Sequence, residues 1–151
     1  MNTILEFGQP ISKNYITRPG SYAVFFNEKE EVGIVKTNDG YYFLAGGGME
    51  EGETAEETLH REVREEAGLF MDITSPIGTV MEHYHDKGND QYYKKIINLY
   101  LIEPKVFVPE AQTELDHTFM WLPISEAHRL MYHDAYRWGI EKGYELWKNN
   151  K

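Results

Sequence analysis

The sequence predicts an α+β domain in which helices cover a mixed β-sheet. Short runs of β-branched and aromatic residues lie between turn residues in the first third of the chain, and an amphipathic helix follows them. Further strands and two more helices complete the pattern. Because strands and helices do not alternate in a regular βαβ order, a mixed sheet is favoured over an all-parallel one.

Three strands are predicted ahead of the first helix, at residues 21–26, 31–37 and 41–44. Each is rich in valine, isoleucine, phenylalanine or tyrosine. The second and third are joined by Asn38-Asp39-Gly40, a sequence typical of tight hairpin turns. We therefore expect an antiparallel meander.

Three successive glycines, Gly46, Gly47 and Gly48, follow the third strand. Without Cβ atoms, such a run lets the backbone adopt positive φ angles and approach a ligand or metal closely. A flexible connector is the alternative. The run is not a phosphate-binding P-loop, because no Gly-Lys-Ser/Thr follows, and it lacks the last glycine of a dinucleotide-binding fingerprint.

The first helix is predicted to begin at Glu53 or Thr54 and to end at Gly68, a residue suited to the left-handed conformation at a helix end. Glu56 and Glu57 would lie in its first turn, where negative charge is favourable. Its apolar stripe, which should dock on the core, consists of Leu59, Val63 and Ala67.

Weaker patterns predict the elements beyond this helix. We expect strands at residues 73–82, 95–103 and 118–122, and helices at residues 125–131 and 134–148 capped by Ser125 and Asp134. The polar segment 85–93 is predicted to be a mobile loop. Five aromatic residues should pack the last helix on the sheet or, where exposed, form a dimer face: Tyr132, Tyr136, Trp138, Tyr144 and Trp147.

Three glutamates of the first helix, Glu62, Glu65 and Glu66, lie at i, i+3 and i+4 and therefore share one face. Carboxylates held this closely repel one another, at a cost in stability, unless a cation lies among them. Because the chain has no cysteine, oxygen ligands favour a hard ion such as Mg²⁺ or Mn²⁺. On this spacing alone, a solvated acidic helix face is the commoner explanation.

The full pattern around these glutamates resembles the signature of the Nudix hydrolases, G-x5-E-x7-R-E-U-x-E-E-x-G-U, where U is aliphatic. Gly47, Glu53 and Arg61 begin it here, and residues 62–69 complete it with every position met. Its seven fixed letters would recur by chance on the order of once in 10⁸ to 10⁹ start positions. The resemblance is strongest over residues 46–69, with one departure, Ala45, where many relatives have proline before the glycines.

The resemblance implies an α/β/α sandwich with a mixed sheet, formed as a single Nudix domain by residues 1–151. It also implies metal binding by the three helix glutamates and by the backbone carbonyl of Gly46. Glu62 or Glu65 would orient or deprotonate the attacking water, unless a carboxylate from a later loop does so. Among the three acidic candidates in that loop, Glu110, Glu114 and Asp116, we choose Glu114.

Four residues of the pattern are expected to be structural rather than catalytic: Gly47, Glu53, Arg61 and Gly68. Glu53 and Arg61 look like the ion pair that ties the loop to the helix in this family, and a charge-assisted pair explains why both residue types are needed.

Substrate contacts are assigned to Tyr84 and Lys94. Tyr84 lies close to a marker tyrosine of dinucleoside-polyphosphate hydrolases, although packing is the common alternative in a chain with 11 tyrosines. Lys94 and Lys95 could contact phosphates, and an exposed strand edge would explain them equally well. His83 and His85 would share one strand face, but two histidines are weak support for a zinc site.

The implied activity is hydrolysis of a nucleoside diphosphate linked to another moiety, dependent on Mg²⁺ or Mn²⁺. Signatures of ADP-ribose, coenzyme A and NADH hydrolases are not apparent, which favours nucleoside triphosphates, including oxidised ones, and dinucleoside polyphosphates. Two alternatives stay open. One is a catalytically silent nucleotide-sensing Nudix module, and the other is an acidic α+β interaction domain without a site.

Composition limits the class of protein. At 151 residues the chain fits one domain, and its net charge of −10 disfavours binding to long nucleic acids. No segment approaches membrane-spanning length. The absence of cysteine, and of a basic start with an apolar run in residues 1–8, favours a cytoplasmic protein. We expect a monomer or a homodimer.

Overall fold

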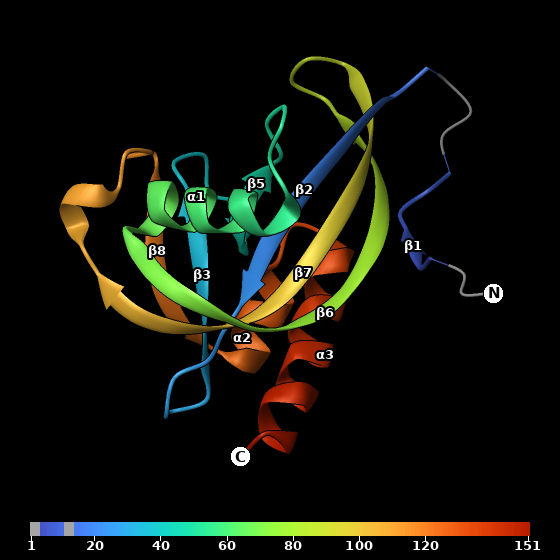
Figure 1. The fold of residues 1–151 in the computed structure, drawn as a ribbon. Helices are drawn as coiled ribbons and strands as arrows, with labels where there is room; N and C mark the ends of the chain where they lie inside the picture. Colours follow the sequence, from blue (N-terminus) through green and yellow to red (C-terminus); the bar gives the residue numbers. More distant parts are fainter. Residues whose placement is uncertain (1–3, 11–13) are drawn as a thin grey trace.

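The structure is a computed structural model that describes residues 4–10 and 14–151 (Figure 1). The expectation about the N-terminal sequence rests partly on residues 1–3, which lie outside the described residues. The elements in chain order are β1 (Glu6–Phe7), β2 (Ile16–Val24), β3 (Glu31–Thr37), β4 (Tyr42–Phe43), β5 (Ala45–Gly48), α1 (Ala55–Ala67), β6 (Leu69–Asp86), β7 (Gln91–Phe107), η1 (Pro109–Ala111), β8 (His117–Pro123), α2 (Ile124–Leu130) and α3 (Asp134–Asn149).

The described strands form two sheets. The larger has the order β1-β6-β7-β2-β5, and the smaller has the order β4-β3-β8. In the larger sheet β1 pairs with β6 and β2 pairs with β7 in parallel, whereas β6 with β7 and β2 with β5 are antiparallel. The predicted mixed sheet is therefore confirmed. The predicted antiparallel meander is confirmed only for its second and third strands, β3 and β4, because β2 lies in the larger sheet.

Successive residues along and just after β2 face two different hydrophobic cores. Val24 and Phe26 pack in the core that includes α3, and Ala23 and Phe25 pack in the core that includes α1. Helices α1 and α3 consequently cover opposite faces of the larger sheet (Figure 1). Burial on both faces explains the continuous buried run at residues 20–26 and confirms the α/β/α arrangement.

Helix α1 follows the prediction closely. Thr54 is its N-cap and exchanges two hydrogen bonds with Glu57, which together make a capping box. Gly68 ends the helix in the left-handed conformation, with φ of 64°. Leu59, Val63 and Ala67 are all buried in the core under the helix, so the predicted apolar stripe is confirmed.

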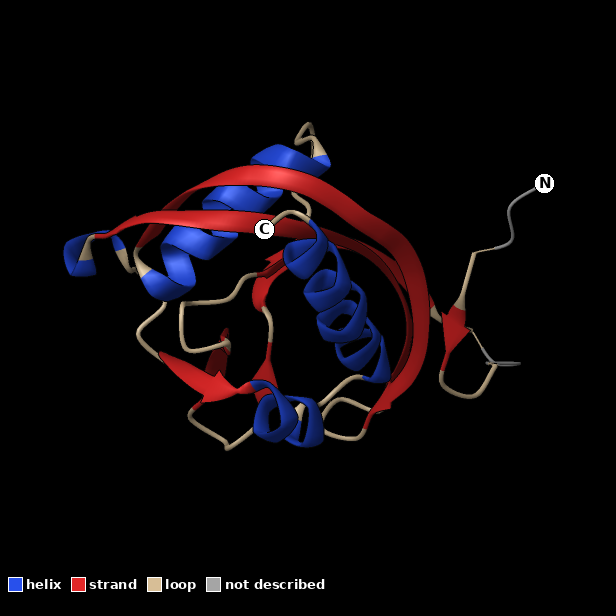
Figure 2. Ribbon diagram, turned by 90° about the horizontal axis from the view of Figure 1, so that it is seen from below, coloured by secondary structure: helices blue, strands red, loops and turns tan. Residues whose placement is uncertain are grey.

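Strands β6 and β7 are much longer than predicted and form one curved hairpin (Figure 2). The predicted loop 85–93 is wrong, because the strands continue to Asp86 and resume at Gln91. Stacked rings hold this polar end together: Tyr84 lies 5.2 Å from Tyr93, between ring centroids, and His85 lies 4.3 Å from Tyr92. Three register shifts along β6 account for the curvature.

Other boundaries also differ from the prediction. Residues 46–48 do not form a flexible connector, because they pair with β2 as part of β5. The two C-terminal helices begin as expected to within one residue, but Ser125 and Asp134 are not their caps. Pro123 and His133 hold those positions without side-chain cap bonds, and Asp134 instead binds Arg137 at 2.7 Å.

The C-terminal aromatic residues mostly pack as expected. Tyr136 is fully buried, and three others contact the same core: Trp138, Tyr144 and Trp147. Tyr132 is 43% exposed. None of the helices among the described residues is both long and apolar enough to span a membrane.

Candidate active site

Helix α1 places its glutamates at the edge of β5 in unequal surroundings. Glu62 and Glu66 are 9% and 5% exposed, whereas Glu65 is only half-buried. Desolvation raises the pKa of Glu62 and raises that of Glu66 well above its usual range. Hydrogen bonds to Arg61 and to the backbone of Gly46 oppose this effect without cancelling it.

Arg61 connects the loop before α1, the helix and β5. Its Nε and Nη2 donate to the two carboxylate oxygens of Glu53, at 2.6 and 2.9 Å. Nη1 donates to Glu62 at 2.8 Å, and Nη2 also donates to the carbonyl oxygen of Gly48 at 3.0 Å. The guanidinium holds the pKa of Glu53 at about 2. This pair therefore fixes the strand of glycines against the acidic face of α1.

The glycines of β5 allow the backbone to lie directly against these carboxylates. The Gly46 N–H donates to Oε1 of Glu66 at 2.8 Å in a buried hydrogen bond. A Cβ on Gly47 would lie 2.5 Å from the carboxylate carbon of Glu62, closer than any side chain tolerates. A side chain at position 47 would thus displace the carboxylate of Glu62 from its present place.

The segment that precedes β8 brings a fourth carboxylate to this face. The backbone N–H groups of Thr113 and Glu114 both donate to the carbonyl oxygen of Glu65, at 3.0 and 2.9 Å. One oxygen each from Glu62, Glu65 and Glu114 then lie within 4.8 Å of one another. Glu110, one of the other loop candidates, is exposed in η1 and belongs to neither carboxylate group described here.

A second group, which the sequence analysis did not anticipate, consists of Glu66, Glu114 and His117, with ligand atoms again within 4.8 Å. His117 begins β8 opposite Thr37, and its Nε2 lies 3.1 Å from Oε2 of Glu66. Its position 51 residues after Glu66 leaves no local spacing that would have indicated the contact. Asp116, the last of the loop candidates, is exposed and contacts Nδ1 of His117 at 3.0 Å.

These residues fit a divalent cation. The donors are mainly carboxylate oxygens, two of them on buried side chains whose charge is poorly solvated, and the glycine strand leaves room beside them. The fit comes from the donor chemistry and the close approach at Gly47. The same donors would suit any divalent ion that accepts oxygen ligands.

A cavity of about 290 Å³ adjoins the carboxylates. Its lining includes Glu66, His117 and the glycines of β5, and also Tyr22, Tyr136 and Lys95. The ammonium of Lys95 lies 3.2 Å from the hydroxyl of Tyr136 and 5.0 Å from the ring centroid of Tyr22. The lining of the cavity thus combines a carboxylate, aromatic rings and one positive charge.

A second cavity, of about 220 Å³, shares Lys95 and Phe43 with the first. Tyr84 lines it, and burial raises the pKa of this tyrosine to about 12. Lys94 alternates with Lys95 along β7, so its side chain leaves from the opposite face of the strand. Of the two lysines, the structure brings Lys95 to the cavities.

A buried pair of an imidazole and a carboxylate borders the second cavity. Nδ1 of His133 lies 2.6 Å from one oxygen of Glu82, and the other oxygen accepts the Ala135 N–H at 2.7 Å. Burial lowers the pKa of His133. The sequence analysis missed both residues, because β6 and the start of α3 meet only in the folded chain.

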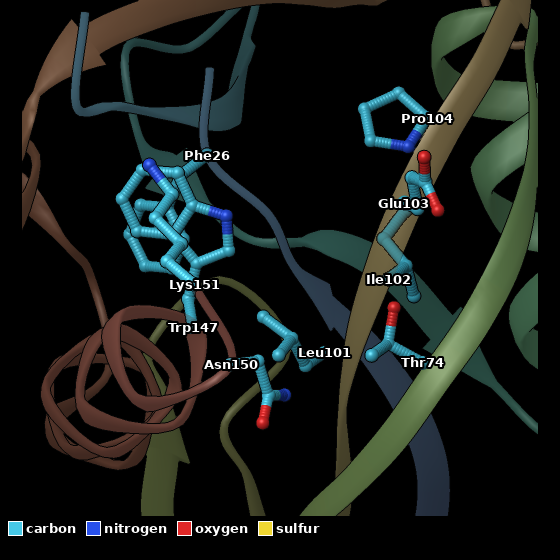
Figure 3. A pocket seen from close by; sticks show the side chains of 9 residues that line it. All are labelled: Phe26, Thr74, Leu101, Ile102, Glu103, Pro104, Trp147, Asn150 and Lys151. Carbon is cyan, nitrogen blue, oxygen red and sulfur yellow. The ribbon is translucent and has the colours of Figure 1, made fainter. Parts of the chain in front are cut away.

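A third hollow, of about 230 Å³, lies at the end of α3 against β7 (Figure 3). Phe26 and Trp147 form its apolar side, and the ammonium of Lys151 lies 3.5 Å from the centroid of a Trp147 ring. Its lining contains a single carboxylate, Glu103, and shares no residue with the carboxylate groups on α1. This hollow is therefore separate from the carboxylate groups on α1.

Comparison with known proteins identifies the family of this chain. A family model described as the NUDIX domain matches residues 16–141. A 36-residue stretch is 58% identical to a nucleoside triphosphatase NudI from Enterobacter sp. (strain 638) and covers 24% of this chain and 26% of that protein. A 54-residue stretch is 44% identical to the mouse (Mus musculus) 8-oxo-dGDP phosphatase NUDT18, covering 33% of this chain and 17% of that protein. The matches thus span only about a quarter or less of these relatives.

Solved structures share the fold at low sequence identity. A NUDIX hydrolase from Nitrosomonas europaea superposes with a TM-score of 0.68 at 18% identity, over 85% of this chain and 89% of that one. The dihydroneopterin triphosphate pyrophosphohydrolase of E. coli gives 0.59 at 20% identity, over 86% and 97%. The fold, the position of the carboxylates and the match over residues 16–141 together show that this chain belongs to the NUDIX domain family.

Proposed function

We propose that this protein is a divalent-metal-dependent pyrophosphohydrolase that cleaves nucleoside triphosphates, including oxidised ones. Dinucleoside polyphosphates are the second substrate class. The family membership supports a hydrolase of phosphoric anhydrides. The net charge of −10 favours free nucleotides over long nucleic acids, and we propose a cytoplasmic place of action for residues 1–151 working as one domain.

One observation supports this proposal above the others. Oxygens of Glu62, Glu65 and Glu114, from a helix and a distant loop, converge within 4.8 Å of one another, and the neighbouring Glu66 lines a cavity of about 290 Å³. An acidic surface without function would not need two carboxylates buried at a cost, a glycine that admits Glu62, and a loop pinned to Glu65. A silent sensor module has no evident use for all of these carboxylates.

Three roles in this reaction are proposed for residues of the site: metal binding, activation of water and positioning. A bound Mg²⁺ or Mn²⁺ would offset phosphate charge and acidify water, held by Glu62, Glu65 and Glu66 with the backbone of Gly46. Glu65 and Glu114 are the more accessible carboxylates and suit the orientation or deprotonation of water. Arg61 would keep Glu62 and Glu65 in place, since it donates to both.

The nucleoside would occupy the aromatic part of the cavities. Tyr22, Tyr84 and Tyr136 offer ring faces and edges, and Lys95 offers a positive charge to a phosphate or a base carbonyl. The names of the partial relatives, a nucleoside triphosphatase and an 8-oxo-dGDP phosphatase, support a nucleotide of normal or oxidised base. We retain Lys94 as a weaker candidate at the same strand.

The test is release of phosphate, pyrophosphate and nucleotide from a panel of nucleoside triphosphates, 8-oxo derivatives, dinucleoside polyphosphates, ADP-ribose and nucleotide sugars. Each would be assayed with Mg²⁺, Mn²⁺ or chelator. We expect metal-dependent cleavage of a triphosphate, reduced about 10²- to 10⁴-fold in kcat by Glu65→Gln. Circular dichroism should show an unchanged fold in that variant.

The control is Glu110→Gln, an exposed carboxylate of the same acidic region that lies outside both carboxylate groups. It should leave kcat unchanged. Full activity of the Glu65→Gln protein would refute the assignment of the site. Tight nucleotide binding without cleavage of any substrate would instead support the sensor alternative.

A further inference from the structure

His117 is a nitrogen donor at the edge of an otherwise oxygen-rich site. Its Nε2 lies 3.1 Å from Oε2 of Glu66, and its side chain is 17% exposed. Oxygens of Glu66 and Glu114 and one ring nitrogen of His117 all lie within 4.8 Å of one another. Two ligands 2.0–2.2 Å from an ion are at most about 4.0–4.4 Å apart, so small side-chain adjustments would let one ion contact all three.

In His117 and Glu66, the polar atom that does not take part in their mutual contact already has another partner. Nδ1 of His117 lies 3.0 Å from a carboxylate oxygen of Asp116, and Oε1 of Glu66 accepts the buried N–H of Gly46 at 2.8 Å. A metal-binding histidine usually donates its second ring N–H to a carboxylate, which fixes the tautomer and directs the other nitrogen to the ion. Asp116 and His117 have this arrangement, and it leaves Nε2 of His117 next to Oε2 of Glu66, 3.1 Å away.

The backbone holds both sides of the group. His117 begins β8 and pairs with Thr37 of β3, while the N–H of Glu114 donates to the carbonyl of Glu65. The side chain of Gln112 also donates to the carbonyl oxygen of His117, at 2.8 Å. The imidazole is therefore placed by a strand and by a tied loop, and its approach to α1 does not depend on a free side chain alone.

We propose that His117 is a metal ligand, and that Glu66, Glu114 and His117 form a second ion position next to the one formed by Glu62, Glu65 and Glu114. Glu114 belongs to both groups. In this arrangement the orientation or deprotonation of water falls to Glu65 and not to Glu114, and Glu66 contributes to the second position. The inference rests on the proposed function in one respect, that divalent ions bind at this face of α1. It adds a nitrogen ligand that the glutamate pattern does not contain.

The choice of ion follows from the donor. Mg²⁺ prefers oxygen ligands, whereas imidazole suits transition metals, and affinity rises from Mn²⁺ to Co²⁺. The second position should therefore favour Mn²⁺ or Co²⁺ over Mg²⁺. The position formed by three carboxylates should discriminate less.

The decisive measurement uses the full chain with Mn²⁺ and without nucleotide. Electron spin-echo modulation of the bound ion reports an imidazole nitrogen in its first shell, and ¹⁵N-labelling of histidine alters that signal. We expect nitrogen coupling in the unmodified protein and its loss in His117→Ala. Calorimetry should show Co²⁺ affinity at this position reduced about 10- to 100-fold in the variant, with Mg²⁺ affinity changed much less.

Two variants separate ligation from simple hydrogen bonding. His117→Asn keeps a donor near Glu66 but removes the imidazole, so it should also lose the nitrogen signal. His128→Ala changes an exposed histidine on α2 and should retain it. Bound Mn²⁺ without nitrogen coupling in the unmodified protein would overturn the proposal and leave His117 as a partner of Glu66 only.

The outcome is independent of turnover. A nitrogen signal with no cleavage of any nucleotide would uphold His117 as a ligand while the proposed function fails. Cleavage with metal but no nitrogen signal would do the reverse.

Discussion

The three glutamates on one face of α1 are not equivalent, and their surroundings indicate different roles. Glu66 is tied to the Gly46 N–H and faces His117, and Glu62 accepts from Arg61 at 2.8 Å. Glu65 has the most exposed side chain of the three, at 26%, and its contact to Arg61 is longer, at 3.3 Å. Glu65 is therefore the glutamate most free to contact water or substrate.

Gly47 offers a test of how closely the backbone must approach Glu62. In Gly47→Ala the new Cβ would lie 2.5 Å from the carboxylate carbon, and the flexible end of Glu62 would move away. We expect metal affinity to fall about 10- to 100-fold with little change in thermal stability. Calorimetric titration with Mn²⁺ measures the first and thermal unfolding the second.

The next residue in the same strand is a matched control. In Gly48→Ala the nearest atom to the added Cβ is a backbone oxygen of Pro19 at 3.9 Å, an ordinary contact. This variant should bind metal normally. Equal loss of affinity in both variants would mean that β5 as a whole, and not the space at position 47, controls the site.

The sequence predicted the part of the site that depends on helical spacing and not the part that depends on tertiary contact. Glu62, Glu65 and Glu66 share a face because any helix of this pattern would place them so. Glu114 reaches them only because two backbone N–H groups of its loop bind the Glu65 carbonyl. His117 and Lys95 come from strands whose register no local pattern specifies.

At the scale of elements, α1 and the loop before it act as one unit. Thr54 and Glu57 cap the N-terminus of the helix, and the ion pair of Glu53 with Arg61 binds the loop to the helix. Glu53 also accepts hydrogen bonds from the backbone of Glu50 and the hydroxyl of Thr58, at 2.8 and 2.9 Å. The unit presents its glutamates in a fixed orientation, and loss of Glu53 should loosen it.

The Glu53 carboxylate gives this unit a pH dependence. Its pKa falls from 4.5 to about 2 on folding, chiefly through Arg61, so it stabilises the native state above about pH 4.5. That contribution is lost as the pH falls through the window down to about 2. Glu53→Gln should therefore lower the urea midpoint of unfolding at pH 7, and the difference from the unmodified protein should vanish towards pH 2.

Glu56→Gln is the control for this series, since Glu56 is exposed in the first turn of the same helix. Its effect should be small at every pH. A difference between the Glu53→Gln and unmodified proteins that persists undiminished at pH 2 would contradict the ion-pair explanation.

Among the elements, α1 was predictable because three independent signals agree on it, namely its cap, its apolar stripe and its terminal glycine. The hairpin of β6 and β7 was not, because its polar end is held by ladder hydrogen bonds and stacked rings. Neither leaves an alternation of apolar and polar residues in the sequence. The division of the strands into two sheets likewise depends on long-range pairing, as between β3 and β8.

For the whole molecule, the acidic site is a source of instability that a cation would relieve. The chain has a net charge of −10, and burial raises the pKa of both Glu62 and Glu66. The folded, metal-free protein therefore binds protons at these groups more readily than the unfolded chain does. Its stability should fall as the pH rises above the ordinary glutamate value of 4.5, opposite in sign to the effect of Glu53.

Bound metal should remove this penalty. At a free Mn²⁺ concentration about 100 times its dissociation constant, the ion stabilises by about 2.7 kcal/mol. For a chain of this size that corresponds to a melting temperature higher by roughly 5 to 10 °C, reversed by chelator. Thermal unfolding with and without Mn²⁺, at pH 4.5 and pH 8, checks both the rise in melting temperature and its dependence on pH.

The rise in melting temperature caused by Mn²⁺ should be larger at pH 8. At that pH protons compete less with the ion, and the metal-free protein bears more uncompensated buried charge. Glu66→Gln separates this cause from a general effect of salt, since it removes one buried carboxylate and keeps the side-chain volume. In that variant the metal-free protein should be more stable at pH 8 and the increment smaller. An increment that is the same at both pH values, in both proteins, would mean that Mn²⁺ binds away from these carboxylates.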